Sequence, residues 1–299
     1  MEIRQLKYFI AVAQTLNFSE AARRLYITQG TLSQQIQQLE YEMGSQLFER
    51  SSRSVSLTEA GEELLPLALE VTQASEACLT RMRDLRGALA GTLNLGCLGT
   101  FRGMMADAVK EFIRENGGVK VNIVFATEGE LVEMLRKKEI DIALTYLTTS
   151  DEEDIDAEPL LWTSLHILMR KDHPLAGEPY LSLEQIKDYG IILPGRGMQA
   201  RRSIERLVGI DTRKLNIKVE TNHPEVAMDL LQSTSLIAIS TPLPAADRPG
   251  ITAVKLENDS YQMQCCALRL RSGYCKRSSE LFLQLLRDSA KFERIARGM

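Results

Sequence analysis

Apolar residues recur at helical spacing in three successive segments near the start of the chain. Residues 6 to 16 form the first stripe, as expected of a helix that buries one face. Ser19 is placed to cap a short second helix, and Thr28 is placed to cap a third. The residues expected to anchor the third helix are Leu32, Ile36, Leu39 and Met43. A short two-stranded hairpin is predicted next, from residue 47 to residue 57.

The outer face of the third predicted helix carries amides and hydroxyls but no charge. Its residues are Gln29, Thr31, Ser33, Gln34, Gln37 and Gln38. Such side chains exchange hydrogen bonds without repelling phosphates, which suits contact with base edges and the DNA backbone. Helices, a tight turn and a hairpin in this order indicate a winged helix-turn-helix, which places one helix in the major groove. The alternative is a solvated glutamine-rich surface.

We call the predicted DNA-binding domain, residues 1–57, the reader. Two arginines near its predicted hairpin tip are further candidates for DNA contact. Arg50 and Arg53 are placed to lie along phosphates or to enter the minor groove, unless they are ordinary loop charges. The residues expected to bind DNA are Ser19, Thr28, Gln29, Thr31, Ser33, Gln34, Gln37, Arg50 and Arg53.

The charge of the reader is nearly balanced. Residues 1 to 57 hold six basic and five acidic side chains, and the whole chain has a formal net charge of −4. Affinity from counterion release is therefore modest. Direct readout and the avidity of a dimer would have to supply most of the DNA binding.

A long helix is predicted from a cap at Thr58 to about residue 86. Its apolar or small residues alternate steps of four and three, which is typical of a helix that pairs with a partner helix. They are Leu64, Ala68, Val71, Ser75, Cys78, Met82, Leu85 and Leu89. Pro66 lies inside the helix and is expected to kink it. The stripe predicts dimerisation; the alternative is that it packs on its own domain.

From Gly91 onward, strands and helices alternate. Strands are predicted at 92–98, 119–126, 140–146, 161–170, 215–221, 235–240 and 261–270, with another within GIILPG and a last helix over 278–295. The acidic segment 151–158 is predicted to be a solvated loop. Alternating strands and helices indicate an α/β fold with parallel sheets, here two lobes joined by two crossovers, like a periplasmic binding protein.

The predicted domains are a winged helix-turn-helix over 1–57, a linker helix over 58–90 and an effector-binding domain over 91–299. Lobe I of that last domain is expected to hold 91–161 and 268–299, and lobe II to hold 162–267.

Ligands of open α/β lobes bind beyond the carboxyl ends of strands, where helix N-termini converge. Three such points stand out, and they comprise Gly99, Thr100 and Phe101; Arg196, Gly197 and Met198; and Thr221 and Asn222. Backbone N–H groups together with guanidinium charge predict an anionic effector that bears a carboxylate or phosphate. For Arg201 and Arg202 an ordinary surface role is an equal alternative, and the wall formed by residues 233–244 is left open.

Catalysis is disfavoured by the scarcity of candidate groups. The three histidines lie beside no triad or metal pattern, and the five cysteines show no metal-ligand spacing. No metal or cofactor is therefore expected, and the thiols are expected to be buried. No apolar run approaches the length of a membrane span, and no signal peptide is recognisable, so we expect a cytoplasmic protein. An enzyme and a solute-binding protein remain the rival classes.

One set of residues, together with two short motifs, forms a recognisable family pattern. The set is Leu6, Phe9, Phe18, Ser19, Ala21, Ala22, Leu25, Gln29, Leu32, Ser33, Ile36, Leu39, Glu40, Leu47, Phe48, Arg50, Leu57, Thr58, Glu59, Ala60 and Gly61, with HPLA at 173–176 and EIDIAL at 139–144. On these residues the chain closely resembles the LysR-type transcriptional regulators.

This resemblance implies a ligand-responsive, sequence-specific regulator of transcription. It also implies double-stranded DNA, a small-molecule effector and RNA polymerase as partners, and a homodimer or homotetramer. Some such proteins sense peroxide through cysteines, although no cysteine spacing here indicates it.

Two positions depart from the family pattern. Gly30 stands where proline is usual, and Gln34 stands where arginine is frequent. Because Gln34 lacks the charge of an arginine, the preferred DNA site is expected to differ in detail from the family's usual interrupted palindrome.

Overall fold

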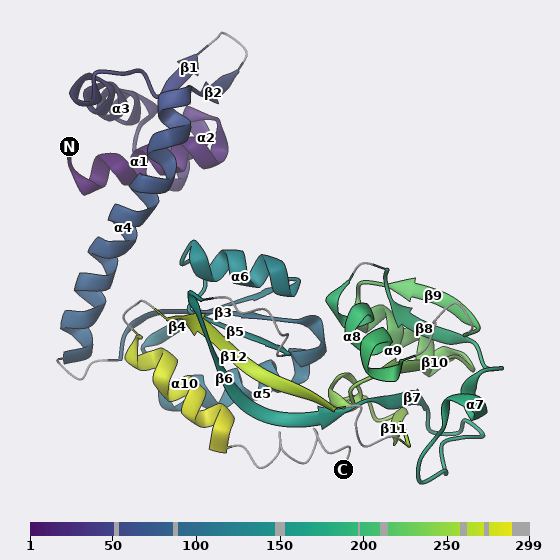
Figure 1. The fold of residues 1–299 in the computed structure, drawn as a ribbon. Coiled ribbons are helices and arrows are strands. Elements are labelled where there is room, and N and C mark those ends of the chain that lie inside the picture. Colours follow the sequence, from purple (N-terminus) through teal and green to yellow (C-terminus); the bar gives the residue numbers. More distant parts are fainter. Residues whose placement is uncertain are drawn as a thin grey trace. The chain divides into compact units, whose positions relative to one another are not determined.

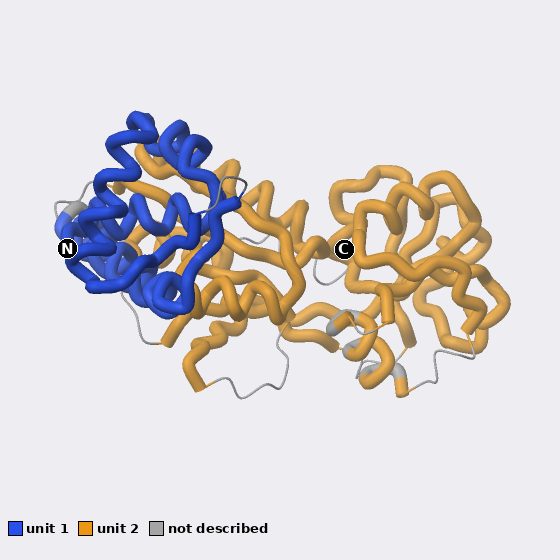
Figure 2. The backbone as a smooth tube through the Cα atoms, turned by 90° about the horizontal axis from the view of Figure 1, so that it is seen from above, with its two compact units in different colours: residues 1–88 blue, residues 89–299 orange. Residues whose placement is uncertain are grey.

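The computed structural model divides into two compact units, Met1–Ala88 and Leu89–Met299 (Figure 2). It describes residues 1–50, 54–85, 89–146, 153–196, 198–209, 215–257, 262–271 and 275–288. The elements of both units are drawn in Figure 1.

Unit 1 has the predicted order of three helices and a hairpin. It contains α1 (Ile3–Thr15), α2 (Phe18–Arg24), α3 (Gln29–Met43), β1 (Phe48–Arg50), β2 (Val55–Leu57) and α4 (Glu59–Leu85). Strands β1 and β2 pair antiparallel, with Phe48 opposite Leu57. The predicted winged helix-turn-helix is therefore confirmed.

Of the two caps predicted for α2 and α3, one is confirmed. The side chain of Thr28 accepts a hydrogen bond from the Thr31 backbone N–H over 3.2 Å, as predicted. For α2 the prediction is wrong, because Asn17 rather than Ser19 is the cap and accepts from the Glu20 N–H over 3.0 Å. The helix begins early because Phe18 is drawn into the core, where its ring packs edge-on against that of Phe48.

Three of the four predicted anchors of α3 are fully buried, namely Leu32, Ile36 and Leu39. Met43 is 37% exposed, so its assignment as an anchor is wrong. It occupies the last turn of α3, which ends at Gly44 in the left-handed conformation and has passed beyond the core.

Helix α4 starts at the predicted cap. Thr58 Oγ1 accepts from the Gly61 N–H over 3.1 Å and donates to the Gln46 carbonyl over 2.6 Å. Gly61 is required here for close approach, since a Cβ at this position would lie 2.2 Å from the Leu47 carbonyl oxygen. The first turn of α4 is thus packed directly against the chain that enters β1.

The apolar stripe of α4 is partly packed in the core of unit 1 and partly exposed. Leu64 and Ala68 pack against the core of unit 1, as the alternative interpretation expected. Farther along, Val71, Cys78 and Met82 are exposed. Leu89 lies outside the helix and packs against the core of unit 2. Within the described part of α4, the surface available to a partner helix therefore runs from Val71 to Met82.

Unit 2 holds two five-stranded sheets, which define lobe I and lobe II (Figure 1). The lobe I sheet has the order β4 (Val119–Phe125), β3 (Gly91–Cys97), β5 (Ile142–Tyr146), β12 (Gln262–Leu270), β6 (Ile155–Ser164). The lobe II sheet has the order β11 (Ile251–Lys255), β7 (His166–Arg170), β10 (Ile237–Ser240), β8 (Ile191–Pro194), β9 (Ile217–Thr221).

Helices cover both sheets. Lobe I carries α5 (Arg102–Glu115), α6 (Glu128–Arg136) and α10 (Arg277–Asp288), and lobe II carries α7 (Leu183–Ile186), α8 (Gln199–Val208) and α9 (Pro224–Ser233). In lobe I, α5 and α10 lie on one face of the sheet and meet through the rings of Phe112 and Phe282, while α6 lies on the other face (Figure 1). The α/β class is confirmed.

The crossovers between the lobes differ from the predicted ones. The predicted strand 161–170 is two strands, since β6 ends at Ser164 in one sheet and β7 begins at His166 in the other. The expected lobe borders after residues 161 and 267 therefore fall inside β6 and β12. The acidic segment is also not all loop, because β6 begins at Ile155. A mainly apolar segment predicts a strand but does not show which neighbour each half pairs with.

Two buried histidines in lobe II predict a pH-dependent stability. Burial lowers the pKa of His166 and of His173. The neutral rings therefore stabilise the fold fully above the ordinary pKa of 6.5, and this contribution is lost as the pH falls below it. We expect the urea midpoint of lobe II to fall between pH 7 and pH 5, a decrease that should be smaller in His166→Gln. Exposed His223 is the control, since His223→Gln should leave the pH profile unchanged.

Candidate DNA-binding surface and ligand cleft

The outer face of α3 is open to solvent, as its uncharged pattern predicts. Gln29, Thr31, Gln34, Gln37 and Gln38 are exposed, and Ser33 is half-buried. At the N-terminal end of the face, Ser19 Oγ donates to Gln29 Oε1 over 2.9 Å, so a residue of α2 supports the first residue of α3. The Thr28 and Thr31 hydroxyls lie 2.8 Å apart. These bonds hold the start of α3 in a defined arrangement.

The sequence predicted that Arg50 extends from the hairpin toward phosphates or the minor groove. In the structure its guanidinium is instead bonded to the protein. Its Nη1 donates to Ser33 Oγ over 3.0 Å, and its Nη2 lies 3.4 Å from Glu40 Oε2. Its guanidinium carbon also lies 4.4 Å from the centroid of the Phe18 ring. Arg50 is thus held against α2 and α3. Arg53 lies outside the described residues.

Gln34 supplies a test of which face of α3 meets DNA. We expect Gln34→Arg to bind DNA more tightly and to steepen the dependence of log Kd on log salt by about 0.9, the value for one additional phosphate contact. The measurement is fluorescence anisotropy over a salt series. Tyr41→Arg is the matched control, since Tyr41 is exposed in the last turns of the same helix. An unchanged salt slope for Gln34→Arg would place this residue away from DNA.

A cleft of about 1410 Å³ lies within unit 2 and is lined by both lobes. All three predicted points contribute to it, through Gly99, Thr100, Arg196, Met198, Thr221 and Asn222. Gly197 lies outside the described residues. The rule that ligands bind beyond the carboxyl ends of strands (the strand-end rule) therefore identifies residues that are distant in sequence and line one cavity.

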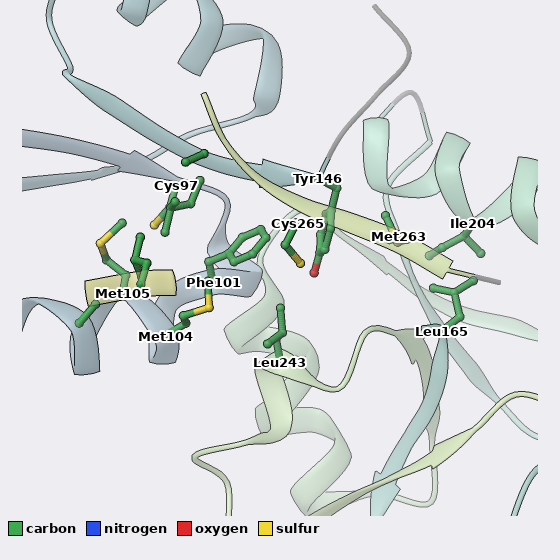
Figure 3. Packing of buried hydrophobic residues seen from close by; sticks show 14 of the residues in the cluster. Cys97, Phe101, Met104, Met105, Tyr146, Leu165, Ile204, Leu243, Met263 and Cys265 are labelled. Carbon is green, nitrogen blue, oxygen red and sulfur yellow. The ribbon is translucent and has the colours of Figure 1, made fainter. Parts of the chain in front are cut away.

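Phe101 and Arg201 do not line the cleft. Phe101 is fully buried and packs against Tyr146 at a ring distance of 4.9 Å, because the turn after β3 directs it into the core (Figure 3). Its assignment as a ligand residue is wrong. Arg201 is 2% exposed and bonds to Glu205, Glu220 and the Pro194 carbonyl. It serves the structure of lobe II.

Tyr146 connects the two lobes beneath the cleft. It ends β5 of lobe I, and its hydroxyl lies 2.7 Å from the Thr241 hydroxyl, just after β10 of lobe II. Burial raises the pKa of Tyr146, so the phenol stays neutral. A second connection joins Arg102 Nε of α5 to Glu225 Oε1 of α9 over 2.6 Å. A ligand that touches Tyr146 is therefore in contact with a bond that spans the lobes.

Helix α6 forms a wall that the sequence analysis missed. Thr127 and Glu130 make a capping box at its start, and Glu128, Glu130 and Glu133 all line the cleft. Hydrogen bonds from Thr127 lower the pKa of Glu130, which keeps its carboxylate ionised. The visible signal was a threonine followed three residues later by glutamate, directly after a strand.

The two walls of the cleft carry opposite charge. Lobe II contributes Arg196, Arg202 and Arg206. Lobe I contributes the three glutamates of α6 and one arginine, Arg136, whose Nη1 lies 2.8 Å from Glu133 Oε1. Arg196 Nε also lies 3.4 Å from Oε1 of Glu220, near the end of β9. Between the walls the lining is mainly apolar, with half-exposed Phe125 on one side and Met198 on the other.

Among the described residues, no group of histidine, cysteine, aspartate or glutamate side chains is arranged to hold a metal ion. Burial raises the pKa of Cys97 to about 12 and also raises that of Cys265, so neither thiol forms the reactive thiolate readily. Cys78 on α4 is exposed. Nowhere in the part of the chain that the structure describes is a helix long and apolar enough to cross a membrane.

Known protein families match both the DNA-binding part and the ligand-binding part of the chain. Residues 3–62 match the model of the bacterial regulatory helix-turn-helix protein, lysR family, and residues 86–291 match the LysR substrate binding domain. The chain is 32% identical to the regulator ShiR of Corynebacterium glutamicum, over 81% of this chain and 83% of that protein. It is 26% identical to the activator CmpR of Synechocystis, over 85% and 86%.

Solved structures share the fold over nearly the whole chain. A full-length OxyR variant from Pseudomonas aeruginosa has a TM-score of 0.73 at 22% identity, covering 100% of this chain and 97% of that one. Full-length CbnR in complex with its target DNA has a TM-score of 0.69 at 23% identity, covering 97% and 100%. With a helix-turn-helix reader and a two-lobed ligand-binding domain in one chain, this protein belongs to the LysR family of ligand-responsive, DNA-binding transcriptional regulators.

Proposed function

We propose that the uncharged face of α3 reads DNA while the cleft of unit 2 senses a small metabolite with an anionic end. The reader residues are Ser19, Thr28, Gln29, Thr31, Ser33, Gln34 and Gln37, supported by Arg50, and the cleft residues are Gly99, Thr100, Arg196, Met198, Thr221 and Asn222. Because the proposed partner is DNA, the proposed location of the protein is the cytoplasm. The proposed role involves no catalysis.

The single observation that carries the ligand proposal is the charge division of the cleft. The arginines of lobe II favour a carboxylate or phosphate. Across the cleft, the three glutamates of α6 outnumber Arg136 of the same helix, so this wall repels a second anionic group. The effector is therefore a metabolite with one anionic end, whose other end is apolar or cationic. A ligand that contacts both walls favours one separation of the lobes, which is the differential affinity that a conformational response needs.

The proposed assembly is a homodimer through α4, within either a dimer or a tetramer. It rests on Val71, Cys78 and Met82, which are exposed along one side of the described helix. Two readers on one dimer would contact two half-sites of a DNA site. Ligand-dependent movement of the lobes would then change the geometry of the bound DNA and the contact with RNA polymerase.

A thermal-shift series tests the ligand proposal. The probes are monocarboxylates, dicarboxylates, amino acids and inorganic phosphate, each added to the full-length protein. A ligand present at about 100 times its Kd stabilises the protein by about 2.7 kcal/mol. We expect monocarboxylates or amino acids to raise Tm, and Arg202→Gln to abolish the shift. The control Arg114→Gln removes an exposed arginine of α5 that does not line the cleft and should retain it. A shift by dicarboxylates alone, or no shift by any probe, would contradict the proposal.

A further inference from the structure

Arg50 ends β1, the first strand of the hairpin, and its guanidinium is already engaged by the protein. It donates to Ser33 Oγ of α3, lies beside Glu40 of the same helix and stacks on the Phe18 ring at the start of α2. Its side chain is 33% exposed. Three elements of the reader thus meet at one side chain.

Glu40 makes this arrangement difficult to leave. Its side chain is 12% exposed, and its Oε1 accepts from the N–H groups of Leu47 and Phe48 over 2.9 and 3.3 Å. Glu40 therefore fastens α3 to the first strand of the hairpin while its other oxygen faces Arg50. If Arg50 turned outward to a phosphate, it would leave a mostly buried carboxylate without its positive partner, which is costly.

The bond between Arg50 and Ser33 has a consequence for the serine. A guanidinium offers only donors, so Ser33 Oγ must accept, and its single proton remains for another acceptor. Among the described residues, Ser33 Oγ has no acceptor of its own in the structure. Ser33 lies one helical turn from Gln29 and one from Gln37, both exposed. The proton is thus available on the side of α3 that carries the amides.

We propose that Arg50 is a positioning residue that fixes Ser33 as a hydrogen-bond donor toward DNA, an inference that rests on the proposed contact between α3 and DNA. At this point of the interface the protein then selects an acceptor: a phosphate oxygen, a purine N7, the guanine O6 or the thymine O4. The amino groups of adenine and cytosine are rejected, since two donors would face each other. Arg50 acts through Ser33 and makes no phosphate contact itself.

The test measures the affinity of the full-length protein for a duplex that it has selected from a random-sequence library. We expect Arg50→Gln and Ser33→Ala each to weaken binding about tenfold, as for the loss of one directed hydrogen bond to a charged or polar acceptor. Once Ser33 is alanine, adding Arg50→Gln should cost less than about twofold, because the two residues act as one unit. The dependence of affinity on salt should stay that of the wild-type protein in all three variants.

Two results would overturn the proposal. One is a salt slope reduced by about 0.9 in Arg50→Gln, which would mark a direct phosphate contact. The other is full additivity of the two substitutions. Arg50→Lys guards against misfolding as the cause, since it keeps the charge but lacks the planar fork whose two nitrogens contact Ser33 and Glu40. With Tm unchanged, Arg50→Lys should bind as weakly as Arg50→Gln, and wild-type affinity in this variant would also contradict the proposal. Arg24→Gln, an exposed arginine of the same unit, is the control.

Discussion

Gly61→Ala is expected to destabilise unit 1 by about 3 kcal/mol, at the upper end of overpacking costs. The added Cβ would lie 2.2 Å from the Leu47 carbonyl oxygen and 2.9 Å from Leu57 Cδ2. A backbone oxygen cannot move aside as a flexible side chain can, so α4 must shift away from the hairpin. Urea unfolding of the full-length protein, followed by circular dichroism, should show the transition of unit 1 at a lower urea concentration than in the wild-type protein.

Gly129 provides the matched control. It also lies in the first turn of a helix, α6, but a Cβ there would meet no atom within 4 Å. Gly129→Ala should therefore be neutral or stabilise by up to about 1 kcal/mol. If both substitutions changed stability equally, the close approach at Gly61 would not be what holds α4 against the hairpin.

The second large effect is expected at the exposed stripe of α4. A double variant, Val71→Glu with Met82→Glu, should yield a monomer and weaken DNA binding by about 100-fold or more, because the second half-site contact is lost. Both side chains are about half exposed, at 43% and 52%, so folding of the single chain should be little affected. Analytical ultracentrifugation gives the mass, and fluorescence anisotropy gives the affinity.

Ala77→Glu is the control for added negative charge on the same helix. Ala77 is exposed on α4, about 120° around the helix axis from Val71. This variant should remain a dimer and keep most of its affinity. Were the double variant still a dimer with wild-type DNA binding, α4 would not be the interface.

Helical periodicity predicted unit 1 well because its helices are amphipathic and short-range signals end them. Leu32, Ile36 and Leu39 are buried as their spacing required. The misassigned cap of α2 arose where two residues satisfy one rule. Asn17 and Ser19 are both good caps, and the choice between them depends on the burial of Phe18, which only the packed structure reveals.

In unit 2 the strand-end rule led to the cleft, but not to everything that lines it. Asn222 was predicted because it directly follows a strand, and Thr100 because it lies in the turn after one. Phe101 was misassigned because the sequence does not show how a turn rotates its last residue. The glutamates of α6 were missed because a capping box predicts a helix start and not the surface that the helix faces.

Sheet pairing was the least predictable part of the fold. Residues 161–170 were predicted as one strand although Thr163, Ser164 and His166 interrupt the apolar residues, and the chain changes sheets there, at Leu165. Its first half pairs with β12 and its second half with β10 and β11. Such pairings join residues far apart in the chain, and local periodicity carries no information about them.

The central claim is that the amide and hydroxyl face of α3 lies against DNA. Hydroxyl-radical footprinting of the full-length protein on genomic fragments at low ionic strength tests it most directly. The wild-type protein should protect two half-sites on a preferred fragment. A triple variant, Gln29→Ala, Gln34→Ala and Gln37→Ala, should lose that protection without a change in Tm. An identical footprint from the triple variant, or no preferred fragment for the wild-type protein, would contradict the account.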